Sequence, residues 1–483
     1  MRPNDARTLC LAKAHHPAEK HHPHEGRTRL TRFLTDRVYQ KLPHEWLQAF
    51  NNLSNEELRI QLENWTENGS QAVHNTFPDS FRSFLQDVQR LSLDRQSDCC
   101  AEEVDYGTGA KELEVPNHLT YGMSVKKLHE VSRMAVSVNE LCQENGIRTI
   151  VDLGAGLGYL DCVLSEVLGY KVVAVESNES RTGSAKERAV RHSRKHPDQS
   201  TGSLHYATLR IGGSGDQDTT ENLRTILADC DVGDEPICLI GLHCCGDLTP
   251  LFLQTFHQLG NATAFICVGC CYHLMTPAVD RSEIQFCPLS WSAKEMKRRL
   301  WLTNDLLLTV PSLRLASQET RVTPCLDELD TQVEGHFFRA VLESVADEFG
   351  VLLRRNKRHP GAATNNGGRD FESQLTDLAR NYCFTGTGTK SIDLDSLHTE
   401  MRERKMQFKE LLPSFRLFRI LQGLMQGVLE TFIAVDRYLH VKEDLHVLDA
   451  RCNRDKTRSS SAIQPNKLDK IIQNSESLRS ITA

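Results

Sequence analysis

Three glycines at alternate positions follow a short apolar segment in VDLGAGLGYL, residues 151–160. They are Gly154, Gly156 and Gly158, and Asp152 precedes them. Glycine is needed where a backbone approaches a ligand or adopts a positive φ, because a Cβ atom would collide there. A carboxylate at the end of the preceding strand can accept hydrogen bonds from a ligand amino group. The segment therefore predicts a ligand-binding turn between a strand and a helix.

A second acidic residue, Glu176, ends the next predicted strand, KVVAVE at residues 171–176. It follows Gly154 by roughly 20 residues, the spacing at which an acidic side chain binds ribose hydroxyls in doubly wound sheets. A dinucleotide site requires G-x-G-x-x-G, but Tyr159 stands at the third glycine position. The observed D-x-G-x-G-x-G resembles the first motif of S-adenosylmethionine-dependent methyltransferases. S-adenosylmethionine is therefore predicted as the cofactor ahead of NAD, and a turn without a ligand is the other alternative.

Two further motifs place histidine beside paired cysteines. They are LIGLHCCGDLTP at residues 239–250 and ICVGCCYHL at residues 266–274, and each follows a predicted strand. The carboxyl ends of parallel strands meet at one edge of a sheet, which is its ligand-binding edge. Both motifs are therefore predicted to lie beside the substrate. Their residues with possible chemistry are His243, Cys244, Cys245, Asp247, Cys270, Cys271, Tyr272 and His273.

These side chains admit three interpretations. The thiols can be small apolar groups packed under the cofactor. They can form a zinc site, but adjacent cysteines lack the C-x₂-C spacing of such sites, so no metal is predicted. A histidine or carboxylate can instead act as general base or as the group that orients it. His273 is the first candidate for a catalytic role, followed by His243 and Asp247.

A cluster of basic residues, Lys126, Lys127 and His129, precedes the glycine motif. Methyltransferases often close over cofactor or substrate with this part of the chain, although lysines on a surface helix are an equally good interpretation. The residues predicted to contact the substrate are Lys126, Lys127, His129, Cys270, Cys271 and Tyr272.

The elements that must position these residues alternate between short apolar strands and helices. The strands are TIVDL, KVVAVE, PICLIGL and TAFICVG, and this alternation predicts an α/β fold with a doubly wound, Rossmann-like parallel sheet. Helical periodicity predicts helical N- and C-terminal extensions. The predicted organisation is a disordered His-rich tail (1–28), a helical N-terminal region (29–95), a linker (96–115), the sheet domain (116–345), a helical C-terminal region with a basic loop (346–450) and a disordered tail (451–483).

Composition limits the environment of the chain. Its 483 residues include 57 Lys and Arg, 64 Asp and Glu and 16 Cys, with a formal net charge of −7 at pH 7. Any contact with nucleic acid therefore depends on a local basic patch. The N-terminal residues lack the apolar core of a signal peptide, so we expect reduced thiols in an intracellular protein, cytoplasmic or nuclear. Charged residues interrupt the apolar stretch Leu417–Leu439, which predicts a buried helix and no membrane partner.

The motifs YGMSVKKLHEV, VDLGAGLGYL, GLHCCGDLT and VGCCYHL, in this order, closely resemble those of the methyltransferase-like protein 25 family. One branch of that family is labelled ribosomal RNA adenine dimethylase domain-containing. The likeness extends to LPHEWLQAF (42–50) and LETFIAVDRYL (429–439) and covers most of residues 30–445. It implies an S-adenosylmethionine-dependent methyltransferase whose acceptor the motifs do not define. Relatives usually end in an apolar strand that KEDLHVLDARCNRDKTRSSS does not offer, so we expect the closing edge of the sheet to be missing or replaced.

GLHCCGDLT and CCYH also resemble motifs of a tRNA 2′-O-methyltransferase family, which has a His-x-Cys-Gly element followed by Cys-Cys-His. This resemblance implies RNA as the acceptor, with a ribose hydroxyl as the target. The alternatives are a protein methyltransferase and a non-catalytic scaffold protein that binds the cofactor. Basic residues could receive RNA phosphates, or form a solvated charged surface: Lys186, Arg188, Arg191, Arg194, Lys195, Arg354, Arg355, Lys357 and Arg358.

Overall fold

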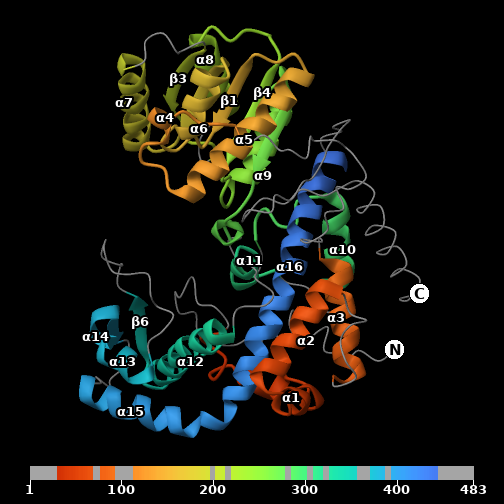
Figure 1. Cartoon of the computed structure of the whole chain (residues 1–483), viewed down its shortest axis with the longest axis vertical. Coiled ribbons are helices and arrows are strands. Elements are labelled where there is room, and N and C mark those ends of the chain that lie inside the picture. The colour runs from red at the N-terminus through yellow and green to blue at the C-terminus, as the bar shows by residue number, and fades with distance from the viewer. Residues whose placement is uncertain are drawn as a thin grey trace. The chain divides into compact units, whose positions relative to one another are not determined.

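The chain divides into two compact units in a computed structural model (Figure 1). The helical unit comprises Met1–Asp94 and Lys297–Phe432, and the sheet unit comprises Arg95–Met296 and Ile433–Ala483. The predicted terminal tails and most of the predicted linker lie outside the residues that the structure describes. Those residues are 30–68, 77–92, 113–195, 202–212, 219–277, 284–301, 308–318, 326–355, 370–386 and 393–443.

The sheet unit alternates strands with helices along the chain, as its sequence pattern predicts. Its strands are β1 (Thr149–Leu153), β2 (Lys171–Glu176), β3 (Ser203–Thr208), β4 (Ile237–Leu242) and β5 (Ala262–Val268). Its helices are α4 (Asn117–Thr120), α5 (Val125–Glu144), α6 (Tyr159–Cys162), α7 (Glu179–Lys195), α8 (Thr219–Asp229), α9 (Leu248–Gln258) and most of α10 (Trp291–Trp301), with a π-helical turn at Val163–Val167 and a 3₁₀ turn at Tyr272–Leu274.

All five strands are parallel and their order is β3-β2-β1-β4-β5. The chain runs outward from β1 to β3 and then returns to the other side of β1 to form β4. Ligands bind in such sheets at this reversal, outside the carboxyl ends of the strands. The glycine motif follows β1 and the first histidine–cysteine motif follows β4, so the order of strands makes the two motifs neighbours.

Apolar residues on both faces of the strands explain why the sheet is covered on both sides. Ile150 and Val172 face a core formed with α5 and α6, whereas Val151 and Val173 face a core formed with α8 and α9. Helix α5 begins at a side-chain cap, where the Lys127 amide donates to Ser124 Oγ at 3.2 Å. The predicted Rossmann-like fold is thus confirmed.

Strand β3 was not among the predicted strands. Its sequence SLHYAT is largely polar, and its side chains alternate between exposed and half-buried because it lies at the edge of the sheet. Within the described residues the opposite edge is β5. We expected the closing strand to be missing or replaced at residues 442–461. Lys442 and Glu443 end α16 (Leu412–Glu443), and the rest of this segment lies outside the described residues.

The helical unit has a separate aromatic core. The rings of Phe33 and Phe415 meet edge to face at 5.0 Å between centroids, and those of Trp46 and Phe81 at 4.9 Å. A capping box is present at Ser54 and Glu57: the Ser54 amide donates to Glu57 Oε2 at 2.8 Å, and the Glu57 amide donates to Ser54 Oγ at 3.2 Å. The elements of the helical unit are α1 (His44–Asn51), α2 (Asn55–Asn68), α3 (Asp79–Leu91), α11 (Val310–Ala316), α12 (Leu326–Glu348), α13 (Phe371–Thr376), α14 (Leu378–Asn381), α15 (Leu394–Gln407) and most of α16 (Leu412–Glu443), with 3₁₀ turns at Val38–Lys41 and Lys409–Leu411.

Two features of this unit differ from the sequence interpretation. Helix α12, most of which the predicted boundaries place within 116–345, packs with the helical unit because Phe337 and Phe338 join the core around Phe33. A two-stranded antiparallel sheet, β6 (Val351–Arg355) with β7 (Tyr382–Gly386), interrupts the predicted helical C-terminal region. Both strands are short and β6 ends in two arginines, so neither has a strong strand pattern.

The segment Lys409–Glu443 is, among the described residues, long and apolar enough to span a membrane, but 67% of its most apolar stretch is buried within the protein. Its last turns from Ile433 belong to the sheet unit. There Asp436, which is buried, accepts hydrogen bonds from the amides of Leu289 and Ser290 at 2.8–2.9 Å. Asp436 thus satisfies backbone donors just before α10, which supports the interpretation of α16 as a core helix.

Candidate functional site

The glycine motif forms a tight turn between β1 and α6. Gly154, Gly156 and Gly158 have φ values of 90°, 63° and 74°, in the left-handed region that favours glycine. The amides of Gly154 and Ala155 both donate to the carbonyl of Val175 on β2, at 2.8 and 3.1 Å. These bonds hold the turn over the carboxyl ends of the first two strands, where the sequence predicts the cofactor.

The glycines of this turn have different surroundings. A Cβ at Gly158 would fall on the hydroxyl of Tyr206, whereas a Cβ at Gly156 would meet only the carbonyl oxygen of Gly154, at 3.9 Å. Gly158 is therefore required by packing, and Gly156 borders open space that a ligand can occupy. Of the three, Gly156 is the position where a larger side chain would compete directly with a ligand.

Glu176 positions the glycine turn. Its Oε2 accepts a hydrogen bond from the Gly156 amide at 3.0 Å, and its Oε1 accepts one from the Asn178 amide at 2.9 Å. The side chain is buried, so these bonds satisfy a carboxylate that would otherwise be costly to bury. The end of β2 and the turn after β1 thus form one rigid wall.

Asp152 shares a buried position with Asp161 on α6, a residue that the sequence analysis did not single out. Burial raises the pKa of Asp152 to about 7, although its interaction with the Asp161 carboxyl lowers the pKa and limits the rise. Burial and the nearby Asp152 charge raise the pKa of Asp161 well above its usual value. Oδ1 of Asp152 is buried with no hydrogen-bond partner among the described residues.

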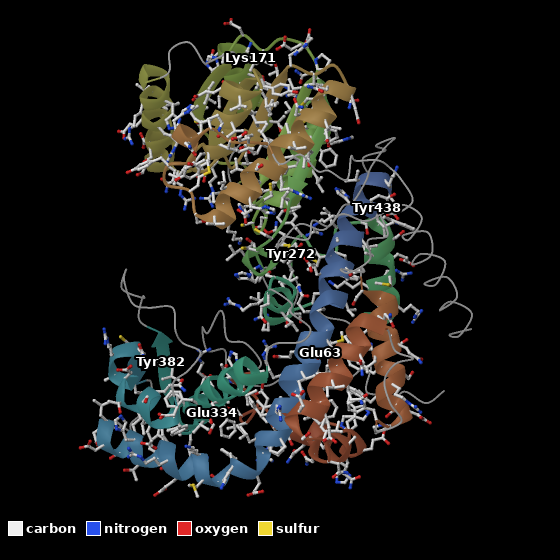
Figure 2. The ribbon with its side chains drawn as sticks, in the orientation of Figure 1. Glu63, Lys171, Tyr272, Glu334, Tyr382 and Tyr438 are labelled. Atoms are coloured by element: carbon white, nitrogen blue, oxygen red, sulfur yellow. The ribbon has the colours of Figure 1, made fainter. Side chains whose placement is uncertain are left out.

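The loops after β4 and β5 come together, as predicted for the two histidine–cysteine motifs. The amide of Gly246 donates to the carbonyl of Cys271 at 3.1 Å, and Cys245 Sγ lies 3.2 Å from Cys270 Sγ. Figure 2 places Tyr272 at the opposite end of the sheet from Lys171, the first residue of β2. Tyr272 and its neighbours therefore lie at the carboxyl edge.

His243 is held by two residues of α5. Its Nε2 lies 3.0 Å from Glu130 Oε2 and 2.9 Å from Lys127 Nζ, and Lys127 Nζ lies 2.8 Å from the same carboxylate oxygen. Burial by itself would raise the pKa of Glu130, but hydrogen bonds from His243 and Lys127 lower it to about 2. Lys126 is 57% exposed and contacts the other oxygen, Oε1, at 3.3 Å. The sequence analysis quoted Glu130 within a motif but assigned it no role.

The remaining predicted residues take different positions. Asp247 binds Thr276, whose amide donates to Oδ1 at 2.9 Å and whose hydroxyl contacts Oδ2, so this carboxylate fastens the two loops together. His273 is half-buried in the 3₁₀ turn after Cys271. Tyr272 donates from its hydroxyl to the carbonyl of Gly269 at 3.3 Å. His129 is half-buried on α5, and its role stays a prediction.

The predicted basic segment on α7 is partly used for structure. Arg188 donates to the carbonyl of Tyr121 at 2.9 Å, and its guanidinium lies 4.0 Å from the ring centroid of Tyr159. Arg191 is exposed. The structure does not describe the side chains of the other basic residues predicted to receive phosphates: Arg194, Lys195, Arg354, Arg355, Lys357 and Arg358.

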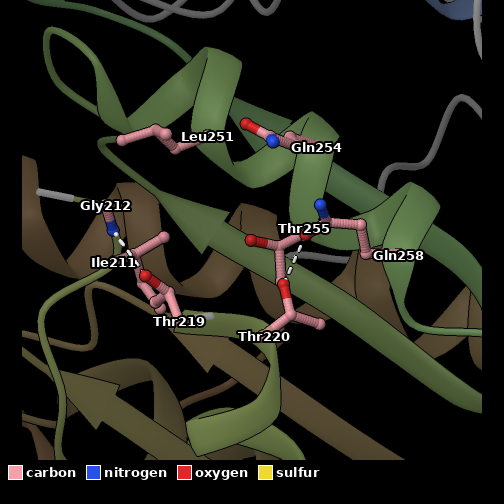
Figure 3. Close-up of a pocket in the computed structure, with 8 residues that line it drawn as sticks. All are labelled: Ile211, Gly212, Thr219, Thr220, Leu251, Gln254, Thr255 and Gln258. Atoms are coloured by element: carbon pink, nitrogen blue, oxygen red, sulfur yellow. Dashed lines mark hydrogen bonds between the residues drawn. The ribbon is translucent and has the colours of Figure 1, made fainter. Parts of the chain in front are cut away.

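A separate cavity of about 400 Å³ lies between α9 and the segments that flank the start of α8 (Figure 3). Across it, Gly212 donates from its amide to Thr219 Oγ1 at 3.4 Å, and the Thr220 hydroxyl bonds to Gln258. The cavity contains none of the predicted cofactor or catalytic residues. The residues that line it are Ile211, Gly212, Thr219, Thr220, Leu251, Gln254, Thr255 and Gln258.

Comparison with known proteins bears directly on this arrangement. Residues 126–278 match the family described as "Methyltransferase domain". The chain carries a methyltransferase domain. The match begins at Lys126 on α5 and ends just after the second histidine–cysteine motif, so the methyltransferase domain contains the glycine turn, Glu176 and both loops at the carboxyl edge. It identifies the chain as a methyltransferase and implies S-adenosylmethionine as the cofactor.

The methyltransferase domain also lies within a longer similarity. The chain is 20% identical to "Probable methyltransferase-like protein 25" of Homo sapiens over 451 residues, with 66% of this chain and 70% of the relative covered. The Mus musculus protein of the same name is 20% identical over 444 residues, with the same coverage. These similarities confirm the resemblance inferred from the motifs.

A structural comparison pairs the chain with coclaurine N-methyltransferase bound to N-methylheliamine and SAH. The identity is 10% and the TM-score is 0.20, with 82% of this chain and 94% of that chain covered.

The residues present fit the implied cofactor. Gly156 leaves open space beside the turn, and Asp152 offers a buried carboxylate oxygen without a partner among the described residues. Glu176 provides a carboxylate at the position where doubly wound sheets bind a ribose. We therefore expect Asp152 to bind the amino group of S-adenosylmethionine and Glu176 to bind its ribose. The main chain of the glycine turn is expected to lie against the cofactor.

Proposed function

We propose that the methyltransferase domain methylates RNA, with a ribose hydroxyl as the acceptor. S-adenosylmethionine supplies a methyl group on a positively charged sulfur, and the acceptor must supply a lone pair and lose a proton. The observation that supports RNA most directly is an exposed aromatic ring, Tyr121, anchored beside the glycine turn. Single-stranded nucleic acid binds by stacking bases on such rings next to basic groups.

Tyr121 is 73% exposed although its backbone is fixed. Arg188 donates to its carbonyl at 2.9 Å, and the hydroxyl of Tyr159 donates to the next carbonyl, that of Gly122, at 2.9 Å. Tyr159 directly follows the last glycine of the turn. Tyr121 is thus connected to the predicted cofactor site through Tyr159. Lys126, five residues further along the chain, adds a positive charge to the same segment. A flipped or unpaired base stacked on Tyr121 would bring its ribose toward the carboxyl edge.

The proton of a ribose hydroxyl needs an acceptor group at that edge. His243 is engaged by Glu130 and Lys127, and Asp247 by Thr276. His273, in the 3₁₀ turn that follows the loop after β5, stays the predicted base because an imidazole can act as a general base. Positioning of acceptor and donor supplies most of the remaining rate acceleration, on the order of 7–11 kcal/mol.

Transfer of a tritiated methyl group from S-adenosylmethionine to fractionated RNA and protein tests the proposal. Gly156→Arg should abolish labelling because its side chain fills the space beside the turn. Gly146→Arg is the matched control, since Gly146 also has a left-handed φ, 65°, and nothing within 4 Å of an added Cβ. Label in RNA that survives in Gly156→Arg, or label found in protein alone, would contradict the proposal.

A second pair of variants tests the stacking platform. Tyr121→Ala should lower kcat/KM for RNA by about tenfold or more, because stacking of one base contributes about 1–3 kcal/mol. Trp291→Ala removes another exposed aromatic ring of the sheet unit and should have no effect. Binding of S-adenosylmethionine should be unchanged in both variants. Equal losses in the two variants would count against a specific role for Tyr121.

A further inference from the structure

Three thiols and one imidazole converge where the loops after β4 and β5 meet. The sulfur atoms of Cys245, Cys270 and Cys271 all lie within 4.8 Å of one another. Cys270 Sγ is 3.2 Å from Cys245 Sγ, 3.7 Å from Cys271 Sγ and 3.7 Å from His243 Nδ1. All four side chains are half-buried. Cys270 therefore sits at the centre of a compact set of soft and borderline donors.

The three separations measured from Cys270 Sγ are close to the edges of a tetrahedral zinc site. Zinc binds thiolate sulfur at about 2.3 Å and imidazole nitrogen at about 2.0–2.1 Å, which makes the edges of the tetrahedron about 3.8 and 3.6 Å. The two separations of 3.7 Å match these edges, and the 3.2 Å pair would need to lengthen by about 0.6 Å. His243 lies beyond 4.8 Å from at least one of the other two sulfur atoms, so its ring would have to move toward that sulfur as the ion binds. We propose that His243, Cys245, Cys270 and Cys271 bind a zinc ion.

The surroundings of His243 support its role as a ligand. Histidine ligands usually donate their second ring N–H to a carboxylate, which fixes the tautomer and the orientation of the ring. Nε2 of His243 lies 3.0 Å from Glu130 Oε2, while Nδ1 is the nitrogen that faces Cys270. Metal binding at Nδ1 leaves the proton on Nε2, where Glu130 accepts it. Glu130 is thus a positioning residue for the fourth ligand.

The charges nearby suit a site with three thiolates. Three thiolates and one Zn²⁺ leave one net negative charge. Lys127 Nζ lies 2.9 Å from His243 Nε2, and Lys126 Nζ lies 3.3 Å from Oε1 of Glu130, which holds His243. The two lysines offset the negative charge of the site, which gives them a role that does not require contact with the substrate.

The fold explains why the ligand spacing is unusual. A C-x₂-C pair binds zinc from one turn, but here the loop after β4 contributes His243 and Cys245, and the loop after β5 contributes the adjacent Cys270 and Cys271. The hydrogen bond from the Gly246 amide to the Cys271 carbonyl holds the loops together. His243 has a φ of 71°, a conformation that non-glycine residues rarely adopt. This backbone places its ring beside the loop after β5.

A site with four protein ligands is closed, as in structural zinc sites. The ion would fix the loops after β4 and β5 relative to each other and thereby hold Tyr272 and His273, which follow Cys271 directly. Its role is therefore to position the acceptor side of the domain.

The experiment uses the full chain, reduced and loaded with Zn²⁺ or Co²⁺ and then freed of excess metal over a weak chelator. We expect one zinc per chain by mass spectrometric metal analysis. The Co²⁺ form should show the intense d–d bands of tetrahedral geometry and a thiolate-to-metal charge-transfer band. Because the wild-type spectrum reports the ligands directly, this result does not depend on whether any variant folds. Absence of both signals would overturn the proposal.

Variants then locate the site. Cys245→Ser and Cys270→Ser should lose the stoichiometric metal, whereas Cys230→Ser and Cys383→Ser, which remove thiols outside the cluster, should retain it. Glu130→Gln should weaken zinc affinity by about 10–100-fold, as is typical for partners of metal-bound histidine. Metal retained in Cys270→Ser would overturn the proposal. So would a Cys245–Cys270 disulfide, found by peptide mapping, that persists after reduction and metal loading.

Discussion

The Gly156 amide donates a hydrogen bond to Glu176 Oε2 at 3.0 Å. One carboxylate at the end of β2 therefore both shapes the glycine turn and stands where a ribose is expected to bind. A residue with both tasks affects the cofactor site twice, through the geometry of the turn and through direct contact.

We expect Glu176→Ala to weaken S-adenosylmethionine binding by about 10–100-fold, because a hydrogen bond to a charged group contributes about 1.5–3 kcal/mol. Glu176→Gln keeps one acceptor oxygen and should lose less. Glu179→Ala, which removes an exposed acid at the start of α7, serves as the control. Isothermal titration calorimetry measures the three affinities, and equal Kd values for Glu176→Ala and the control would contradict the assignment.

Binding of S-adenosylmethionine should strengthen as the pH rises through about 7. The pKa of Asp152 is about 7 in the folded chain, and a cationic amino group binds the ionised form. Below this pKa binding must release a proton, so affinity should fall by up to about tenfold per pH unit. Calorimetry at several pH values, in two buffers with different ionisation enthalpies, counts the proton released. An affinity that is constant between pH 5 and 8 would refute this role of Asp152.

Asp161 should set where this pH dependence lies. Asp161→Asn keeps a neutral donor beside Asp152 and should leave the midpoint near 7, whereas Asp161→Leu removes the donor and should move the midpoint upward. Between about pH 4 and pH 7 the folded chain holds a proton on Asp152 that the unfolded chain releases. The contribution of Asp152 to the free energy of unfolding should therefore be greatest below about pH 4 and become smaller as the pH rises toward 7. Urea unfolding at pH 5 and 7 measures the second effect.

Gly158→Ala should destabilise the fold by about 2–4 kcal/mol, the sum of left-handed strain and overpacking. Its Cβ would fall on the Tyr206 hydroxyl and lie 3.1 Å from the Ala185 Cβ. Gly146→Ala has a similar φ with nothing within 4 Å and should cost only the strain, about 1–2 kcal/mol. Adding Tyr206→Phe should recover part of the loss in Gly158→Ala. Denaturant unfolding of the double-mutant cycle checks this, and simple additivity would rule out the proposed collision.

Asp436→Ala should lower the free energy of unfolding by about 2–6 kcal/mol, because it leaves the amides of Leu289 and Ser290 without their acceptor. Asp436→Asn retains one acceptor oxygen and should cost less. Hydrogen exchange at the amides of Leu289 and Ser290 should accelerate in the Ala variant first. Unchanged protection of these amides would show that the carboxylate does not hold this segment.

Much of the sheet could be predicted from its sequence because β1, β2 and β4 are buried on both faces and are therefore rich in apolar residues. β5 is half-buried, and its sequence is also apolar. β3 lies at an edge, where polar residues such as His205 hide the pattern. The placement of α12 could not be predicted, since its apolar face would suit either unit and only packing of Phe337 and Phe338 against the helical core decides between them.

The cofactor turn could be predicted for a similar reason: its residues are adjacent in the sequence and their spacing carries the geometry. The pair of Glu130 and His243 is separated by 113 residues, and its contact depends on the left-handed backbone at His243, which sequence does not reveal. The thiol cluster likewise draws on two loops, so spacing rules for a single loop gave no signal. Asp161 was missed because a lone acidic residue in a helix usually faces solvent.

The hydrogen bonds of Asp436 join residues that are 147 positions apart in the chain. On a ribosome, where synthesis proceeds at about 5–20 residues per second, the segment around Leu289 would wait about 7–30 s for Asp436 to emerge. During that interval a nascent chain would therefore expose an incomplete sheet unit. A fragment that ends before residue 433 would lack Asp436 and would never complete this unit. Expression of an isolated domain cut at residue 296 should consequently require the α16 peptide in trans.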